Sequence, residues 1–521
     1  MLSGSGIEPV DTEQGQRSYP ANEKGGAHTH HGEIEDAAIL EALQSYVPDT
    51  AEEKRLVRKI DFILLPILWW MYILAHLDRS NIANANAAGM SEDLGLSDNQ
   101  YAMLVSLFFV AYVIFEVPSN MILMKVQPSI YLSTIVWVWG CVVLGMSQTK
   151  SATGLLVGRF FLGAIEAGLY PGALFILTCW YTKKEVGKRF CIFYTSGCVS
   201  PALGGIMAGS VIASLDGARG IPGWRWLLLI ESVVTIVCGF GLYFVLPDWP
   251  INSKMLSPEQ RLLAHVRILR ERDQPWEAEE SALSPLQAFV SVLKDGRTYC
   301  FLLLYSANLL ALTISYFIPT MLRGMGYSKV SAQWMTVPIW MSGVVFQLVW
   351  SWTSDKTQDR RWHNAGLLGL AAIAALVSLL VSNNVVKYVM MCLLIGGMYT
   401  TVPLILNWTS EVMSQPVRKR SIAIALVNSL GHTSFIYGSF LWPSAEGPRN
   451  LKGFAVSTAA LGLGVVLAAL MPVIFKNLPK QDPPQVVQGH EVYIGGDEKL
   501  CGLKEGSTTS ETTLPTALQK N

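Results

Sequence analysis

A series of long apolar runs most strongly limits what this chain can fold into. About twelve of them recur between Ile60 and Phe475, and each is close to the ~20 residues that a membrane-spanning helix needs. Apolar residues make up 51% of the chain and charged residues only 15%, which favours one large membrane domain over several water-soluble ones. The runs therefore predict an all-α, polytopic membrane protein with about twelve transmembrane helices.

A polar segment divides the runs into two sets of six. We expect an N-terminal six-helix bundle over residues 54–247, a C-terminal bundle over 298–478, and a cytosolic linker over 248–297. The tails, residues 1–53 and 479–521, are polar and are expected to be disordered in the cytosol. Two similar bundles joined by a polar linker are typical of transporters built from parallel repeats.

Several element ends follow from local signals. The first span is predicted to begin at Ile60 and to end in the polar string from His76 to Asn84. The fourth is predicted to be interrupted at Pro171 and Gly172. In the linker, Ser257-Pro258 and Ser284-Pro285 each precede a Gln, which predicts two short amphipathic helices. The remaining spans are expected near residues 101–124, 130–148, 190–215, 224–246, 299–322, 334–352, 364–381, 386–406, 422–442 and 454–475.

Basic residues in the loops predict the orientation of the bundle. They gather in loops that fall on one side, together with the cluster that precedes the first span: Lys54, Arg55, Arg58, Lys59, Lys183, Lys184, Lys188, Arg189, Lys356, Arg360, Arg361, Arg418, Lys419 and Arg420. The positive-inside rule then places both termini in the cytosol. Two of these loops, WYTKKEVGKR and WTSEVMSQPVRKR, also resemble each other, as two pseudo-repeat halves require.

The segment GRFFLGAIEAGLYPG, Gly158 to Gly172, holds an Arg and a Glu within an apolar span. Arg159 and Glu166 are seven residues apart, so on a helix they share one face, about 10 Å apart along the axis. Ionisable residues inside a membrane are costly and usually face a cavity or a partner. We interpret them as the polar lining of a translocation path, with Arg159 attracting an anion and Glu166 exchanging a proton. The alternative is a structural ion pair between helices.

Other polar groups within the spans extend this predicted path. Asp78 and Arg79 are adjacent and point about 100° apart on a helix, so one of them is expected to line the path while the other pairs sideways. Glu231 is expected to pair with Arg225, which gives it a structural role. The remaining path candidates are neutral or nearly so: Asn81, Asn308, Gln347, Asn407, Asn428 and His432. Six aromatic side chains either pack the bundle, form an interfacial belt, or contact a ring or acyl chain of a substrate: Trp69, Trp70, Tyr112, Tyr316, Trp340 and Tyr399.

Four motifs in order resemble fungal members of the major facilitator superfamily, and more narrowly its anion:cation symporter group of allantoate, nicotinate and pantothenate permeases. The resemblance covers Ile60 to about Phe475. It implies a major facilitator fold, and it places Glu116, together with the loop residues Asp355 and Arg360, in gating or structural roles. The motifs are IDFILLPILWWMYILAHLDRSNIANA, GRFFLGAIEAGLYPG, GWRWLLLIE followed by LPDWPINSKMLSPEQRLLAHVR, and YGSFLWPSAEGPR.

Two details differ from that group. His432 stands where the group more often has an amide; it either faces the cavity as a donor or proton acceptor, or packs inertly against a helix. The segment SGCVSPALGG, Ser196 to Gly205, partly resembles a signature of proton antiporters, although Pro and Gly often only kink a membrane helix. This second detail keeps export of a secondary metabolite or drug open as an alternative.

The predicted function is transport rather than catalysis. We expect a monomeric permease of the plasma membrane that moves a small organic anion by proton symport. Its expected partners are that anion, protons and the lipid bilayer, with no nucleic acid, metal or cofactor. The chain has no Walker-type nucleotide motif, which argues against an ATP-driven pump. A nutrient receptor without transport is a further alternative, disfavoured by the short, plain tails.

Overall fold

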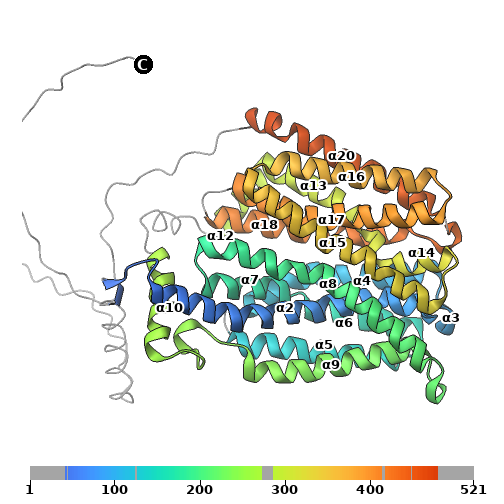
Figure 1. Ribbon diagram of the computed structural model, residues 1–521, viewed down its shortest axis with the longest axis horizontal. Helices are drawn as coiled ribbons and strands as arrows, with labels where there is room; N and C mark the ends of the chain where they lie inside the picture. The colour runs from blue at the N-terminus through green and yellow to red at the C-terminus, as the bar shows by residue number, and fades with distance from the viewer. Residues whose placement is uncertain are drawn as a thin grey trace, which may run out of the picture. The chain divides into compact units, whose positions relative to one another are not determined.

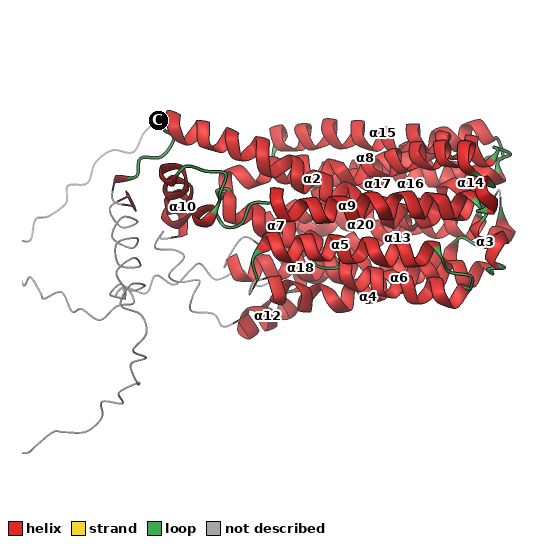
Figure 2. Cartoon of the chain, turned by 90° about the horizontal axis from the view of Figure 1, so that it is seen from below, coloured by secondary structure: helices red, strands yellow, loops and turns green. Residues whose placement is uncertain are grey.

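The apolar runs form helices, and every regular element within the described residues is helical. The computed structural model describes residues 42–43, 45–123, 126–272, 285–413, 417–447 and 449–478. Most of the predicted tails therefore lies outside the described residues. Figure 1 and Figure 2 show long helices running side by side, roughly along one direction.

The first half of the chain forms the helices that are coloured blue to green in Figure 1. They are α2 (Ala51–Ala87), α3 (Met90–Leu94), α4 (Asp98–Leu123), α5 (Pro128–Ser147), α6 (Ala152–Glu166), α7 (Leu169–Trp180), α8 (Lys183–Leu215) and α9 (Gly223–Val245).

Two linker helices and the second half follow. The linker helices begin at the two predicted prolines: α10 (Pro258–Arg272) and α12 (Pro285–Lys294). At the start of α10, the Gln260 backbone N–H donates to Ser257 Oγ at 3.3 Å, as expected for an N-cap. The second half contains α13 (Gly296–Leu312), η3 (Thr313–Tyr316), α14 (Ile318–Gly324), α15 (Lys329–Thr357), α16 (Arg360–Leu380), α17 (Asn384–Val412), α18 (Val417–His432), α19 (Ser434–Gly438), η4 (Ser439–Leu441) and α20 (Leu451–Lys476).

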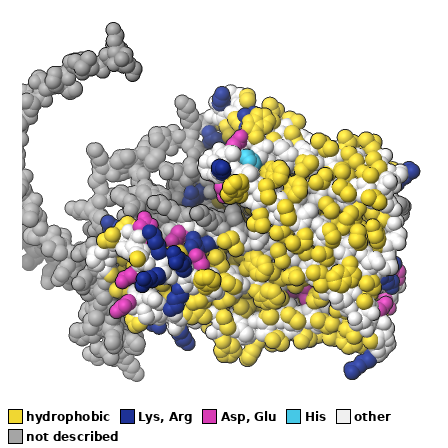
Figure 3. Space-filling view, in the orientation of Figure 1, with side chains coloured by type: hydrophobic (Ala, Val, Ile, Leu, Met, Phe, Trp, Pro, Cys, Tyr) yellow, Lys and Arg dark blue, Asp and Glu magenta, His cyan; other side chains and the backbone are white. Residues whose placement is uncertain are grey.

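Ten candidate membrane spans in the described residues are long and apolar enough to cross a bilayer. Helices also occupy the two remaining predicted positions, but with different properties. α15 is long, but it contains Gln333, Thr336 and Gln347, which lower its hydropathy and are buried inside the bundle. α18 has 16 residues and gives way to the short α19. Figure 3 shows a broad hydrophobic band over the helices, with Lys and Arg gathered near α10.

The first span extends further than predicted. α2 continues through the polar string and ends at Ala87. Its polar side chains find partners inside the bundle: Trp139 Nε1 donates to Asp78 Oδ2 at 2.8 Å, and Arg79 pairs with Glu166. The prediction that this string ends the helix is wrong, because tertiary contacts rather than water satisfy its side chains.

The break in the fourth span lies one turn before the predicted position. α6 ends at Glu166, α7 begins at Leu169, and Pro171 is inside α7. A proline has no N–H for the carbonyl four residues earlier, and its ring crowds that carbonyl. For Pro171 that carbonyl belongs to Ala167, so the helix is interrupted at Ala167 and Gly168, directly beside Glu166.

Gly163 is required for the close approach of α6 to α4. A Cβ added at Gly163 would lie 2.2 Å from the backbone oxygen of Phe108. We expect Gly163→Ala to lower the free energy of unfolding by about 1–3 kcal/mol, the usual cost of overpacking. Thermal melting of the detergent-purified protein measures this effect. Gly145→Ala is the matched control, because nothing lies within 4 Å of a Cβ at Gly145. Equal melting temperatures for the two variants would contradict this packing.

The two halves meet along several helix contacts. α8 packs against α15, α4 packs against α18 and α19, and α2 packs against α14. We call the end of the bundle that carries α10 and α12 the linker end, and the end that carries α3 and α14 the distal end (Figure 1). Polar contacts between the halves gather at the distal end: Asn86 with Thr320, Glu92 with Arg323, Asp98 with Ser444, Tyr101 with Tyr316, and Ser106 with Ser439.

Ion pairs hold the linker helices at the linker end. Arg267 of α10 is buried and pairs with Glu185 at the start of α8. After α12, Lys419 Nζ donates to Asp295 Oδ2 at 2.7 Å. Burial alone would raise the pKa of Asp295, but the hydrogen bonds from Lys419 and from the Arg297 backbone outweigh burial and lower this pKa. These contacts join the linker to both halves.

Candidate functional site

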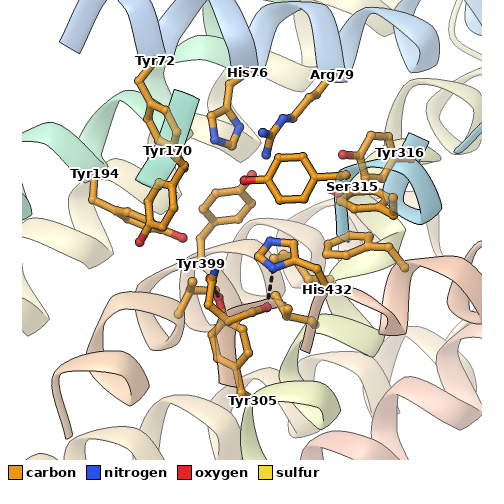
Figure 4. A pocket seen from close by; sticks show the side chains of 17 residues that line it. Tyr72, His76, Arg79, Tyr170, Tyr194, Tyr305, Ser315, Tyr316, Tyr399 and His432 are labelled. Atoms are coloured by element: carbon orange, nitrogen blue, oxygen red, sulfur yellow. Dashed lines mark hydrogen bonds between the residues drawn. The ribbon is translucent and has the colours of Figure 1, made fainter. Parts of the chain in front are cut away.

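A cavity lies between the two halves and is lined predominantly by aromatic side chains (Figure 4). Seven tyrosines and two histidines line it, and Arg79 is its one charged lining residue among the described side chains. Both halves contribute to the wall. The lining residues are Tyr72, His76, Arg79, Phe109, Tyr112, Tyr170, Tyr194, Tyr305, Leu309, Leu312, Ser315, Tyr316, Tyr399, Val402, Asn428, His432 and Phe435.

Arg79 of α2 forms a buried ion pair with Glu166 at the end of α6. Its Nε donates to Glu166 Oε1, and its guanidinium carbon lies 4.8 Å from the centre of the Tyr112 ring. Glu166 is fully buried, and no described group donates to its Oε2. The pair is therefore held between α2 and α6, with the arginine facing the cavity.

Arg159 is placed differently from its predicted role. It is 1% exposed and does not line the cavity. Its Nε donates to the backbone oxygen of Leu104 at 3.2 Å, and its Nη1 lies 3.5 Å from the backbone oxygen of Asp78. Arg159 and Glu166 share a buried face of α6, but the described ion pairs join Glu166 to Arg79 instead. Arg159 thus connects α6 to α4 and α2 at a buried position outside the cavity lining.

The side chains of Asp78 and Arg79 point in different directions, as their 100° separation on a helix predicts. Arg79 faces the cavity, whereas Asp78 points sideways and accepts from Trp139 of α5. Asn81, one turn further along α2, is fully buried and accepts from Asn84 Nδ2 at 3.3 Å. Neither Asp78 nor Asn81 lines the cavity.

His432 lines the cavity, so the structure places it in the first of its two predicted environments. Its Nδ1 lies 2.7 Å from the backbone oxygen of Asn428, and because that carbonyl can only accept, Nδ1 carries a hydrogen. Phe109 of the first half and Phe435 of the second stack on its ring, each at 6.0 Å between ring centres. His76, across the cavity in Figure 4, has no described partner for its Nε2.

The neutral path candidates separate into two groups. Asn428 lines the cavity and accepts from Tyr305 at 3.1 Å. The other amides lie outside it. Asn308 is buried and donates to the backbone oxygen of Met398 at 3.1 Å, Gln347 accepts from Cys198 at 3.6 Å, and Asn407 is half-buried on α17.

The predicted gating residues have distinct surroundings. Glu116 of α4 accepts from Ser429 of α18, which joins the two halves. Asp355 and Arg360, expected in a loop, lie at the end of α15 and the start of α16. Arg360 pairs with Asp355 at 2.7 Å and with Glu411 at 2.9 Å, which ties these two helix ends to the end of α17. Glu231 does not pair with Arg225. Arg225 instead contacts Asp93 at 3.4 Å near the distal end, so the predicted pairing is wrong.

A second cavity lies at the distal end. Asp98, Tyr101, Phe317, Arg323 and Trp442 are among its lining residues. Tyr101 lines this cavity and Tyr316 lines the central one, and the Tyr101 hydroxyl donates to the Tyr316 backbone oxygen at 2.8 Å. This contact therefore stands between the two cavities.

The glycine-rich part of α8 packs against the second half. A Cβ at Gly205 would lie 2.9 Å from the backbone oxygen of Gln333 in α15, so only glycine permits this approach. Ser200 Oγ donates to the backbone oxygen of Ile73 at 2.7 Å. These contacts give SGCVSPALGG a packing role, and its resemblance to an antiporter signature gains no further support from them.

Part of the cavity wall could be predicted from the sequence. Of the six aromatic candidates, Tyr112, Tyr316 and Tyr399 line the cavity, whereas Trp69, Trp70 and Trp340 do not. The remaining tyrosines of the wall were missed: Tyr72, Tyr170, Tyr194 and Tyr305. A usable signal existed on α2, where Tyr72, His76 and Arg79 follow at helical spacing on one face.

Two helical halves that enclose a polar cavity within an apolar bundle define a polytopic membrane transporter. The sequence profile of the Major Facilitator Superfamily matches residues 68–439. The chain belongs to this superfamily, and the protein is therefore a transporter and not an enzyme.

Similar proteins agree with this family. The chain is 35% identical over 437 residues to the MFS-type transporter cnsO of Penicillium expansum, with 80% of this chain and 82% of that protein covered. It is 29% identical over 444 residues to a protein of Agrobacterium vitis that is named as a candidate tartrate transporter, with 84% and 95% covered.

A solved structure shows the same fold. A bacterial homologue of the human lysosomal transporter Spinster, in an inward-facing and occupied conformation, matches with a TM-score of 0.62. The match covers 80% of this chain and 98% of that one at 14% identity. The superfamily fold predicted from the sequence is therefore confirmed.

Proposed function

We propose that this protein is an anion:cation symporter that moves a small organic anion together with protons. The observation that carries the proposal is the ion pair between Arg79, which lines the cavity, and Glu166, which is fully buried and does not line it. Arg79 is the one charged lining residue in the described part of the cavity, and its fork suits a carboxylate. The relative named as a candidate tartrate transporter supports a carboxylate as the charged group of the cargo, although tartrate itself has no ring.

The same pair explains how a proton can be coupled to the anion. A carboxylate substrate that binds Arg79 competes with Glu166 for one guanidinium. A proton on Glu166 removes that competition and leaves Arg79 free for the substrate. When the proton leaves, Glu166 recaptures Arg79 and displaces the anion. The anion and the proton thus bind together and leave together.

The aromatic wall favours a flat substrate. Seven tyrosine rings and the His76 and His432 rings offer rigid faces for stacking and polar edges for hydrogen bonds. A carboxylate that carries an unsaturated ring or amide groups fits this lining better than a fully aliphatic acid. His432 and Asn428 supply contacts from the second half, so a bound substrate would bridge the halves.

The proposal includes a setting in the cell. The two bundles, residues 54–247 and 298–478, would move about the cavity, joined by the linker 248–297. With the linker end and both termini in the cytosol, the distal end, where polar contacts join the halves, would face outward. The monomer would act in the plasma membrane as an importer.

An uptake screen tests this function. Labelled carboxylates with and without a ring are offered to a permease-deficient host that expresses the chain. We expect a ring-bearing carboxylate to accumulate and a protonophore to prevent its accumulation. If loss of the gene in its own host instead traps a metabolite inside the cell, the direction is export and the proposal is wrong.

A further inference from the structure

Glu231 is a buried acid without a described partner. It lies on α9, is 2% exposed, and neither of its carboxyl oxygens has a hydrogen-bond donor among the described residues. It does not line the central cavity. An ionised carboxylate without donors in a helix interface is strongly disfavoured, so this group needs a bound cation of some kind.

The surroundings of Glu231 are polar but carry no donor for it. Thr235, one turn further along α9, is fully buried, and its Oγ1 has no described partner. Its methyl carbon would lie 3.3 Å from a Cβ at Gly140 of α5. The residue before Gly140 is Trp139, which donates to Asp78 Oδ2, and Asp78 Oδ1 has no described partner. Polar atoms from α2, α5 and α9 therefore gather in one layer.

The charged groups near this layer do not stabilise an ionised Glu231. Asp78 is the other acid of this layer, and it repels Glu231 when both carboxyl groups are ionised. Asp78 in turn interacts with Glu166 and with Arg159. Arg79 is paired with Glu166, and Arg159 donates to the backbone oxygens of Leu104 and Asp78. No described ion pair joins either arginine to Glu231.

We propose that Glu231 is a proton-binding site in the interface of α2, α5 and α9, separate from the substrate cavity. The proton neutralises Glu231 beside Asp78, and the hydroxyl of Thr235 lies within the same layer. α2 links this site to the cavity, because Asp78 faces α5 while its neighbour Arg79 faces the substrate. Loss of the proton would place two like charges across the contact of α2 with α9 and would favour movement of α2.

Infrared spectroscopy of the purified, full-length protein tests the site without any substrate. The C=O stretch of a protonated carboxylic acid is resolved from that of a carboxylate. At neutral pH we expect Glu231→Gln to remove one such band from the wild-type spectrum. Glu92→Gln is the matched control, because the Glu92 side chain is 61% exposed and pairs with Arg323, and it should remove none.

A second variant separates proton binding from a purely structural role. In Asp78→Asn the like charge beside Glu231 is gone, so its band should persist but disappear at lower pH than in the wild type. Because Asp78→Asn retains Glu231, this measurement tests the proposal even if Glu231→Gln does not fold. An unchanged band in Glu231→Gln, or a band in Asp78→Asn with unchanged pH dependence, would overturn the proposal.

Discussion

Replacement of Arg79 by glutamine is expected to abolish anion uptake and to destabilise the protein by about 3–5 kcal/mol. The variant removes the one charged lining residue in the described part of the cavity and leaves the fully buried Glu166 without its partner. A loss of this size is a large fraction of the 5–15 kcal/mol that usually holds a domain folded. Labelled uptake and thermal melting measure the two effects separately.

A double variant distinguishes substrate binding from folding. Arg79→Gln with Glu166→Gln removes both charges, so most of the stability should return while uptake remains absent. Arg323→Gln is the control arginine, because it pairs with Glu92 near the surface and should cost at most about 1 kcal/mol. Wild-type uptake in Arg79→Gln, or a double variant no more stable than the single one, would contradict the assigned role.

Replacement of Glu166 by glutamine is expected to separate substrate movement from proton coupling. Glutamine resembles the protonated acid in size and charge, so Arg79 stays free for the anion. The variant should still exchange labelled for unlabelled substrate across the membrane. It should fail to accumulate substrate against a gradient, and its transport should lose its dependence on pH. Retained proton-driven accumulation would rule out Glu166 as the coupling group.

The helical fold could be predicted because hydrophobic run length is a local property. The structure has a helix at every position where an apolar run predicts a span. Two further helices begin at Pro258 and Pro285, as their proline signals predict. Local signals failed where tertiary contacts decide. The string around Asp78 continues α2, because Trp139 and Glu166 provide partners that no neighbouring residue reveals.

The site was predicted in its residue types but not in its pairings. Arg79, Glu166 and His432 are singled out by being ionisable within apolar spans. That Glu166 pairs with Arg79 rather than Arg159 depends on how α2 and α6 are rotated about their axes, which spacing within one helix cannot show. The tyrosines come from several helices of both halves, and each alone is indistinguishable from ordinary packing.

The most direct test of the central claim is proton flux during substrate entry. The purified protein is reconstituted in liposomes that contain a pH-sensitive dye, and a carboxylate found in the uptake screen is added outside. If Arg79 and Glu166 couple the proton to the anion, substrate entry acidifies the lumen in the wild type, whereas Glu166→Gln exchanges substrate without acidification. Acidification by Glu166→Gln at the wild-type rate would contradict this coupling role.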